Sequence, residues 1–381
     1  MAYFDNAATT FPKPECVYEY MDSFYRRSGG NAGRGTYAEA ENSGKLIAET
    51  RARLQGLLHC PAKQVVFEPT ATIALNVIIQ GLIQAGAETV YISPFEHNAV
   101  TRTLHHFEKD GRISVSQLAM GSGIQYDMDQ IRYQFEAKKP DFVIVSQASN
   151  VCGVVSPIEE IFALAKKYGA LTLADMSQTA GLVDTDCGLQ TFDFAVFAGH
   201  KTLYGPTGIS GFVMDPSIDL PAVFFGGTGM ESANQDMPES LPQKYEFGTM
   251  NIQGIAGLSA ALKWIGDTGI DSIWNKEQEH RKKLLEILKK YSFIHLVGQN
   301  SCYPYVGIVS CILDGISSDE AGGILSERGI SVRAGLDCAP LAHQFLGTYP
   351  AGTIRFSASY FTDNEDFCDL EKALNNIADE M

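Results

Sequence analysis

The sequence predicts an α/β fold: a large domain built on a mostly parallel β-sheet flanked by helices, followed by a smaller C-terminal α/β domain. Three observations lead to this prediction. The chain has 381 residues and 45% hydrophobic content, enough for two domains that each bury a core. Strand-like and helix-like segments alternate from about residue 64 to 215. The strand-like segments are continuously apolar, which is typical of strands buried on both faces of a parallel sheet.

The elements of the large domain follow one another in a regular order. A β-branched segment comes first, and helical patterns separate it from later apolar segments. In chain order the segments are VVFEPT, TIALNVIIQGLIQ, TVYISP, ISVSQL, DFVIVSQ, PIEEIFALAKKYG, ALTLAD, FDFAVFAG and GISGFVMD.

A loop rich in Gly, Pro and polar residues is expected at 216–250, and a long helical stretch at 254–291. The rest predicts a compact α/β unit made of strand VGIVSCIL, helix SSDEAGGILSERG, strand ISVRAG, strand TIRFSASY and helix NEDFCDLEKALNNIADE. We therefore expect a large domain at 16–250 and a small domain at 251–381, joined by an N-terminal segment at 1–15. A ligand is expected in the cleft between them, where the carboxyl ends of the strands lie.

Composition excludes several classes of function. The net charge is −16 and the pI is about 4.9, without a cluster of Lys or Arg, so nucleic acid is not an expected partner. The eight cysteines are scattered, without a CxxC pair or a zinc-like spacing, and are expected to be free thiols in a reducing compartment with no metal. The chain shows neither a signal peptide nor an apolar run near the roughly 18 residues of a membrane span, so we expect a cytoplasmic protein without a membrane partner.

Polar residues collect directly after the predicted strands. They are Thr70-Ala71-Thr72, Glu96-His97, Ser149-Asn150, Asp175 with Gln178, and His200-Lys201. Thr72 opens a predicted helix, whose free backbone N–H groups and positive dipole end suit a phosphate, although a plain N-cap explains the same residue.

Two of these residues suggest a specific cofactor. Asp175 ends an apolar strand, and a buried carboxylate requires a partner such as a pyridinium nitrogen, with a helix cap as the alternative. Lys201 lies in a turn after a buried strand, where partly apolar surroundings would lower its pKa and make it a nucleophile toward an aldehyde. The alternative is a surface lysine. His97 could cover a planar cofactor or be an ordinary polar residue. The combination predicts pyridoxal phosphate held as a Schiff base on Lys201.

The same residues lie in motifs of a known family. The motifs are YFDNAATT, NAGRGTY, FEPTATIALN, EHNAV, SNVCGVVSPI, LADMSQTAG, FAGHKTLYGPTG, YEFGTMNIQGI, VRAGLDCAPL and GTIRFSASY. In their content and order, nearly end to end, the chain resembles the class V aminotransferase group of fold-type I pyridoxal phosphate enzymes. Within that group it is similar to the short-loop cysteine desulfurases and selenocysteine lyases. The resemblance implies an aspartate-aminotransferase-like fold.

The resemblance also implies roles around the cofactor ring. Lys201 would carry the cofactor and move the Cα proton of the substrate. Asp175 would pair with the pyridine nitrogen, Gln178 would contact the ring hydroxyl, and His97 would stack on the ring. Asn150 would lie near the ring hydroxyl and the substrate.

Further positions would hold the phosphate and the substrate. Ala71, Thr72 and His200 would bind the phosphate, and Thr249 would reach the phosphate of a partner subunit, which implies a homodimer. Arg355 would bind the substrate carboxylate through its planar guanidinium.

Cys338 would be the nucleophile. The implied reaction converts L-cysteine, or L-selenocysteine, to L-alanine and leaves a persulfide on Cys338 for a sulfur acceptor protein, as in iron–sulfur biosynthesis. Three positions depart from the family pattern. Ala198 replaces a phosphate-binding serine. Leu336 and Asp337 precede the cysteine where short-loop desulfurases usually have histidine, and Asp337 is expected to raise the pKa of the Cys338 thiol.

Three other functions remain alternatives. Another class V enzyme, such as an aminotransferase, a selenocysteine lyase, another amino-acid lyase or a racemase, would share the cofactor site and ignore Cys338. A nucleotide-binding domain would require GxGxxG between its first strand and helix, where this chain has FEPTATIALN. A non-catalytic scaffold would have no cause to keep Lys201, Asp175 and Arg355 in these contexts.

Overall fold

The computed structural model describes residues 1–32, 35, 37–229 and 233–380. Its largest sheet comprises β2 Gln64–Glu68, β3 Thr89–Ile92, β4 Ser114–Gln117, β5 Phe142–Ser146, β6 Leu171–Asp175, β7 Phe194–Ala198 and β8 Ser210–Met214. Within the described part of the chain it has seven strands in the order β2-β8-β7-β6-β5-β3-β4. Neighbours from β4 to β7 are parallel, while β8 runs antiparallel to β7 and β2. The mostly parallel sheet predicted from the apolar segments is thus confirmed.

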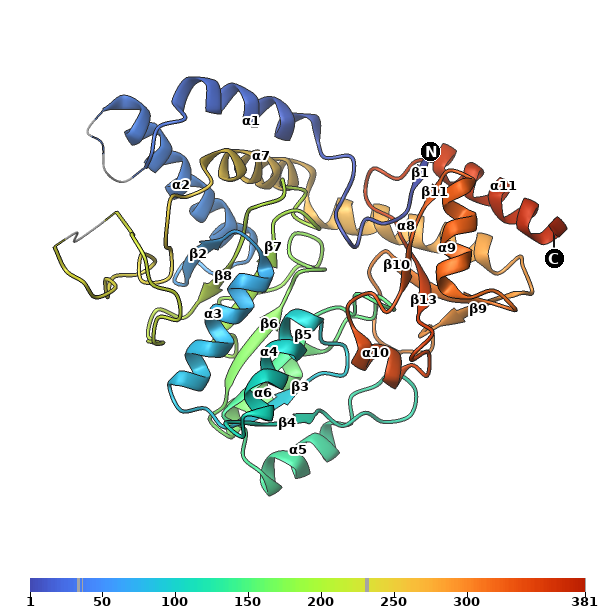
Figure 1. Cartoon of the computed structure of the whole chain (residues 1–381), viewed down its shortest axis with the longest axis horizontal. Coiled ribbons are helices and arrows are strands. Elements are labelled where there is room, and N and C mark those ends of the chain that lie inside the picture. Colours follow the sequence, from blue (N-terminus) through green and yellow to red (C-terminus); the bar gives the residue numbers. More distant parts are fainter. Residues whose placement is uncertain (33–34, 36, 230–232, 381) are drawn as a thin grey trace.

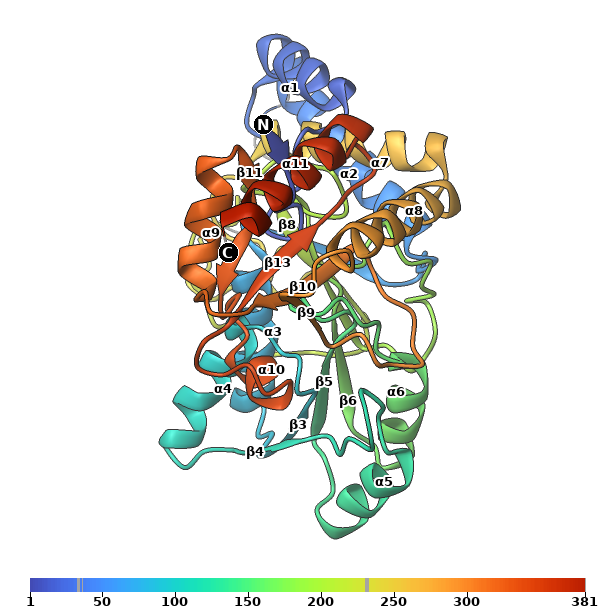
Figure 2. The same cartoon turned by 90° about the vertical axis from the view of Figure 1, so that its right-hand side faces the viewer.

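Helices cover both faces of this sheet. They include α3 Ala71–Gln84, α4 Asn98–Lys109, α5 Met128–Ala137 and α6 Ile158–Lys167. In the side view, α3 and α4 lie on one side of the strands and α6 on the other (Figure 2). Phe142 and Ile144 of β5 belong to the core beneath α3, whereas Val143 and Val145 belong to the core beneath α6. Because alternate side chains point to opposite faces, a strand buried on both faces must be apolar throughout.

A helical layer at one end of the large sheet contains α1 Glu15–Ser28, α2 Ala38–Leu57 and α7 Ile252–Thr268, which pack together (Figure 1). The stretch predicted as one helix is divided into α7 and α8 Ile270–Leu288. Gly269 separates them with φ +86°, ψ 133°, a conformation that interrupts the helical backbone and that glycine adopts without a Cβ clash.

The small sheet contains β9 Ile294–Val297, β10 Ile308–Leu313, β12 Arg333–Gly335 and β13 Thr353–Ser357. Among the described residues these strands form an antiparallel sheet in the order β12-β13-β10-β9. Figure 1 shows it beside the large sheet, together with α9 Ser318–Glu327, α10 Pro340–Phe345 and α11 Asn364–Glu380. The strand predicted for ISVRAG is two short strands, because β11 Ile330–Ser331 pairs with β1 Ala2–Tyr3 instead of joining β12's sheet.

The N-terminus therefore lies against the C-terminal part of the chain (Figure 1). Phe4 is buried in a third core with residues of α8, β10, β13 and α11. The domain bounds 16–250 and 251–381 stay a prediction.

The remaining global features are simple. All eight cysteines are free. Within the part of the chain that the structure describes, no cluster of three or more His, Cys, Asp or Glu is arranged to hold a metal ion. Among those same residues, no helix combines the length and the apolar character needed to cross a membrane.

Candidate active site

A cavity of about 330 Å³ lies where the strands β5, β6 and β7 end, and segments of the small sheet close it. Ten of the eleven predicted site residues line it: Ala71, Thr72, His97, Asn150, Asp175, Gln178, His200, Lys201, Cys338 and Arg355. Thr249 does not. It is exposed in the loop before α7. The structure thus brings together residues that are up to 284 positions apart, from Ala71 to Arg355.

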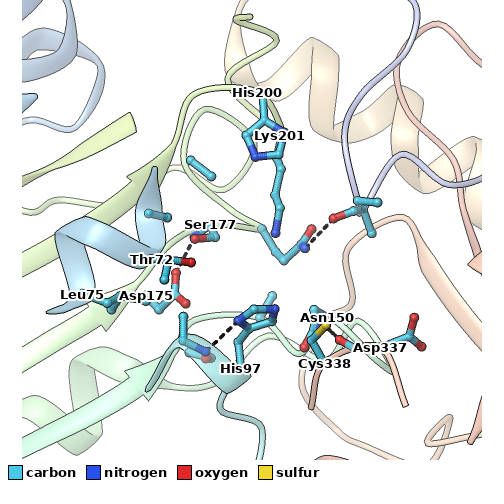
Figure 3. Close-up of a pocket in the computed structure, with 18 of the residues that line it drawn as sticks. Thr72, Leu75, His97, Asn150, Asp175, Ser177, His200, Lys201, Asp337 and Cys338 are labelled. Atoms are coloured by element: carbon cyan, nitrogen blue, oxygen red, sulfur yellow. Dashed lines mark hydrogen bonds between the residues drawn. The ribbon is translucent and has the colours of Figure 1, made fainter. Parts of the chain in front are cut away.

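Lys201 is positioned by the turn that follows β7. The backbone N–H of Lys201 donates to the carbonyl of Ala198, and the N–H of Tyr204 donates to the carbonyl of Lys201. Figure 3 shows the side chain extending from this turn into the cavity. Burial lowers the pKa of Lys201 to about 8, although the nearby Asp175 carboxylate acts in the opposite direction. The amine is therefore partly unprotonated near neutral pH, as a nucleophile requires.

Asp175 is the last residue of β6 and is buried, with 7% of its surface exposed. Its Oδ1 accepts a hydrogen bond of 2.9 Å from the backbone N–H of Ser177. This contact resembles a cap, but residues 177–182 form turns and no helix, so the predicted alternative of a helix cap is wrong. Gln178 follows in the same turn, and its Nε2 donates to the carbonyl of Ala7 at 2.9 Å. This bond leaves the Gln178 Oε1 available to a ligand.

One end of the cavity is formed by the start of α3, which carries Thr72. Helix α3 begins at Ala71, and the N-cap is Thr70, whose Oγ1 accepts from the N–H of Ile73 at 3.2 Å. Thr72 is exposed and is not the cap, which excludes the alternative reading of this residue. The N-terminal N–H groups of α3 and the Thr72 hydroxyl therefore offer donors to an anion.

His200 faces the same cavity and has an unusual buried nitrogen. Within the described residues its Nδ1 is buried without a hydrogen-bond partner. Burial, with Lys201 and Lys13 adding repulsion, lowers the pKa of His200 to about 4. The imidazole is thus neutral near pH 7. A buried nitrogen of this kind is costly unless a ligand supplies its partner.

His97 is the N-cap of α4, and its Nδ1 accepts from the N–H of Ala99 at 3.0 Å (Figure 3). Burial and the nearby Lys201 lower the pKa of His97 to about 4. Because Nδ1 accepts, the neutral ring carries its proton on Nε2. A fixed, uncharged imidazole beside Lys201 can cover a planar ring.

Arg355 lies in β13 with 3% of its surface exposed. Its Nη1 donates to the carbonyl of Asn150 and its Nη2 to Asp5 Oδ1, both at 2.9 Å. Its Nη1 also lies 3.3 Å from Asp337 Oδ1. Arg355 is thus a rigid buried cation at the wall of the cavity.

Cys338 lies in the turn between β12 and α10, and its thiol is exposed. Figure 3 shows it next to Asn150, on the other side of the cavity from Thr72 and Asp175. Asn150 Nδ2 donates to the carbonyl of Asp337 at 2.6 Å, and the N–H of Asn98 donates to the carbonyl of Cys338 at 2.7 Å. The expected effect of Asp337 on the Cys338 thiol stays a prediction. The Asp337 carboxyl is itself buried, and this burial raises its pKa to about 6.

The sequence did not reveal several residues of the site. Asp5, which binds Arg355, is separated from it by 350 positions, and no local pattern links them. Ser177 and Arg333 also line the cavity. Ser177 was detectable in principle, since it follows the strand that ends at Asp175. Glu96, which the sequence placed beside His97, does not line the cavity; it is fully buried and accepts hydrogen bonds from Ser93 and Ser146, and burial raises its pKa to about 7. Of the NAGRGTY motif, residues 33, 34 and 36 lie outside the described residues.

The cavity meets the requirements of pyridoxal phosphate. The Lys201 amine can react with the aldehyde, and the Asp175 carboxylate can pair with the pyridine nitrogen. The start of α3 and the unpaired His200 Nδ1 can bind the phosphate. Arg355 and the Cys338 thiol also line the cavity and are available to contact a substrate. Ala198 lines the cavity with a methyl group where a serine would offer a hydroxyl.

Several known proteins are similar to this chain over nearly its whole length. A probable cysteine desulfurase from Aeropyrum pernix is 32% identical to this chain, and the alignment covers 99% of this chain and 94% of that protein. One from Methanothermobacter thermautotrophicus is 29% identical, and the alignment covers 99% of this chain and 94% of that protein. The apo structure of a cysteine desulfurase from Thermococcus onnurineus superposes with a TM-score of 0.90 at 25% identity, covering 100% of this chain and 95% of the other. The family model for aminotransferase class-V matches residues 2–370. The resemblance inferred from the motifs is confirmed, and the chain belongs to the aminotransferase class-V family.

Proposed function

We propose that this protein is a pyridoxal-phosphate-dependent cysteine desulfurase that converts L-cysteine to L-alanine and leaves a persulfide on Cys338. One observation carries the proposal. The exposed Cys338 thiol lines the same cavity as Lys201, Asp175 and Arg355, although it comes from the small sheet's side of the site. The names of the relatives support it.

The cofactor would be held by Lys201, Asp175, Gln178, His97 and the phosphate-binding donors at the start of α3. When bound, pyridoxal phosphate supplies an electron sink for the charge that develops at the substrate Cα. Asp175 would keep the pyridine nitrogen protonated and thereby strengthen that sink. His97, neutral and fixed at the start of α4, would cover the ring.

The other steps belong to side chains of the protein. Arg355 binds the substrate carboxylate and orients Cα toward Lys201, whose Nζ accepts the Cα proton. Its pKa of about 8 lets the amine both take and return a proton near neutral pH. The Cys338 thiolate attacks the substrate sulfur, so that an S–S bond forms and the substrate C–S bond breaks. The electron pair of that bond stays with Cβ, which takes up a proton, and Lys201 returns the proton to Cα to give L-alanine.

The experiment compares the wild type with Cys338→Ala. The variant should lose alanine release from L-cysteine and keep the visible absorbance of the bound cofactor. Cys368→Ala, which removes another exposed thiol remote from the cavity, is the matched control and should retain activity. Unchanged alanine release by Cys338→Ala would refute the proposal. Amino-group transfer to an added 2-oxo acid would then favour another class V reaction.

We also propose a homodimer and a protein that accepts sulfur from Cys338. Thr249 supports the dimer, because it is exposed and outside its own chain's cavity, as a group serving a partner's phosphate would be. Light scattering should give twice the chain mass of 41.5 kDa. A monomer with full activity would contradict this part of the proposal.

A further inference from the structure

Asp337 occupies an unusual position beside Arg355. Its side chain is fully buried, with 0% of its surface exposed, and its Oδ1 lies 3.3 Å from Arg355 Nη1. Within the described residues, neither carboxylate oxygen has a hydrogen-bond partner. Asp337 is thus held near the guanidinium by charge alone, without the aligned hydrogen bonds that make a buried ion pair strong.

Arg355 is already neutralised without Asp337. Its Nη2 donates to Asp5 at 2.9 Å, and its Nη1 donates to the carbonyl of Asn150. One guanidinium therefore faces two carboxylates. A substrate carboxylate would be a third negative group in this buried space. A bidentate contact between that carboxylate and Arg355 would need free guanidinium N–H groups, and Asp337 lies close to Nη1. Of the two carboxylates, Asp337 is the one with the weaker geometry, so it is the one that a ligand can displace.

The contacts of Asp337 also set the position of Cys338. The Asp337 carbonyl accepts from Asn150 Nδ2, and the Cys338 carbonyl accepts from the N–H of Asn98. Asp337 and Cys338 both have positive φ, 48° and 57°. Asp tolerates this region, but a residue such as Cys is strained there and keeps the conformation only where surrounding contacts impose it. Loss of the Asp337–Arg355 contact therefore favours a different conformation of the turn.

The structure provides space for that movement. Asp337 and Cys338 line the main cavity and also a second cavity of about 630 Å³. Arg102 and Arg333 line this second cavity. A carboxylate that leaves Arg355 can therefore move toward other cations.

We propose that Asp337 is a positioning residue that occupies Arg355 until a substrate carboxylate displaces it, and that this displacement frees the turn carrying Cys338. This inference rests on the proposed function, since it assigns the carboxylate of an amino acid to Arg355. Substrate binding and thiol delivery are thereby coupled through one ionic contact. Such a coupling would change the affinity for the substrate carboxylate about tenfold, and the equilibrium between the two conformations of the turn by the same factor.

The first test follows hydrogen exchange of the peptide covering residues 335–340 in the holoenzyme, with and without propionate. Propionate offers a carboxylate without an amine or sulfur, so the result does not depend on the proposed reaction. In the wild type, propionate should speed exchange in this segment about tenfold. Ordinary ligand binding slows hydrogen exchange in the segments around the ligand. Slower or unchanged exchange would overturn the proposal, and this test needs no substitution.

The second test uses Asp337→Asn, which keeps the shape and tolerates positive φ. Exchange at 335–340 should already be fast in this variant and should not respond to propionate. Asp5→Asn is the matched control: it removes the other carboxylate of Arg355 but leaves the turn's contact, so propionate should still accelerate exchange. Equal behaviour of the two variants would refute a specific role for Asp337.

Ligand affinity gives a separate result. The spectral change of the bound cofactor should show that Asp337→Asn binds L-alanine about tenfold more tightly than the wild type does, and isopropylamine, which lacks the carboxylate, no more tightly. An equal gain for both amines would overturn the proposal. If neither ligand changes the spectrum of any variant, the proposed function fails, while the propionate result still decides the role of Asp337.

Discussion

The lowered pKa of Lys201 can be tested directly through the pH dependence of cofactor attachment. With a pKa of about 8, roughly one amine in eleven is unprotonated at pH 7. A lysine with the ordinary value of 10.5 would have about one in three thousand, a difference of about 300-fold. The rate at which the cofactor-free protein takes up pyridoxal phosphate should therefore rise between pH 6 and 8 and level off above about pH 8.

The assay follows the absorbance change after mixing, at each pH. The cofactor has ionisations of its own, so each rate is divided by the rate for a blocked lysine amino acid in the same buffer. This reference amine keeps the ordinary pKa. The normalised rate should fall above pH 8, because the reference continues to gain free amine while Lys201 does not.

Two variants check the cause. Lys201→Ala should attach no cofactor covalently. Asp175→Asn should move the plateau to lower pH, because the Asp175 carboxylate is the main group that raises the Lys201 pKa against burial. A normalised rate that stays constant up to pH 10 would show that Lys201 has an ordinary pKa, and the reasoning from burial would be refuted.

Three further predictions concern stability. Burial raises the pKa of Glu277 to about 8 from 4.5, while its Oε1 accepts from Tyr204 at 2.9 Å. The neutral carboxyl therefore stabilises the fold fully below pH 4.5, and this contribution is lost as pH rises toward 8. Relative to the wild type, Glu277→Gln should gain about 3 kcal/mol in free energy of unfolding between pH 5 and 8, measured by urea denaturation; a constant difference would contradict this. Thr70→Ala should lose about 1 kcal/mol in the same assay because the α3 cap is removed. Thr72→Ala, the control, should lose less and instead weaken phosphate binding, and equal losses would contradict the assignment of the cap. Gly269→Ala should lower the thermal midpoint, at a cost of about 1–3 kcal/mol, because φ +86° strains any side chain; an unchanged midpoint would contradict it.

Much of the site was predictable because its residues follow strands. Lys201 comes after β7, Asp175 ends β6, and His97 precedes α4, so each position could be inferred from the local alternation of apolar and polar residues. The carboxyl ends of parallel strands meet at one edge, which brings such residues together in any fold of this class. Cys338 and Arg355 came from the family resemblance, since no local pattern distinguishes them.

Local detail was less predictable. The N-cap of α3 is Thr70 and not Thr72, and the helical stretch at 254–291 breaks at Gly269. Both differences depend on backbone conformation at one residue. Periodicity averages over many residues and is insensitive to such a position.

The sequence by itself determined the fold class and the residues at the strand ends, because apolar patterns report burial and the order of secondary structure. Only the tertiary structure decided which acidic groups meet Arg355. Asp5 is 350 positions away from it, and Asp337 reaches it from the turn between β12 and α10. Contacts of this kind depend on how the small sheet packs against the large one. Interactions between side chains distant in sequence leave no trace in local composition, and for that reason the pairing of Asp337 with Arg355 could not be inferred from its position beside Cys338.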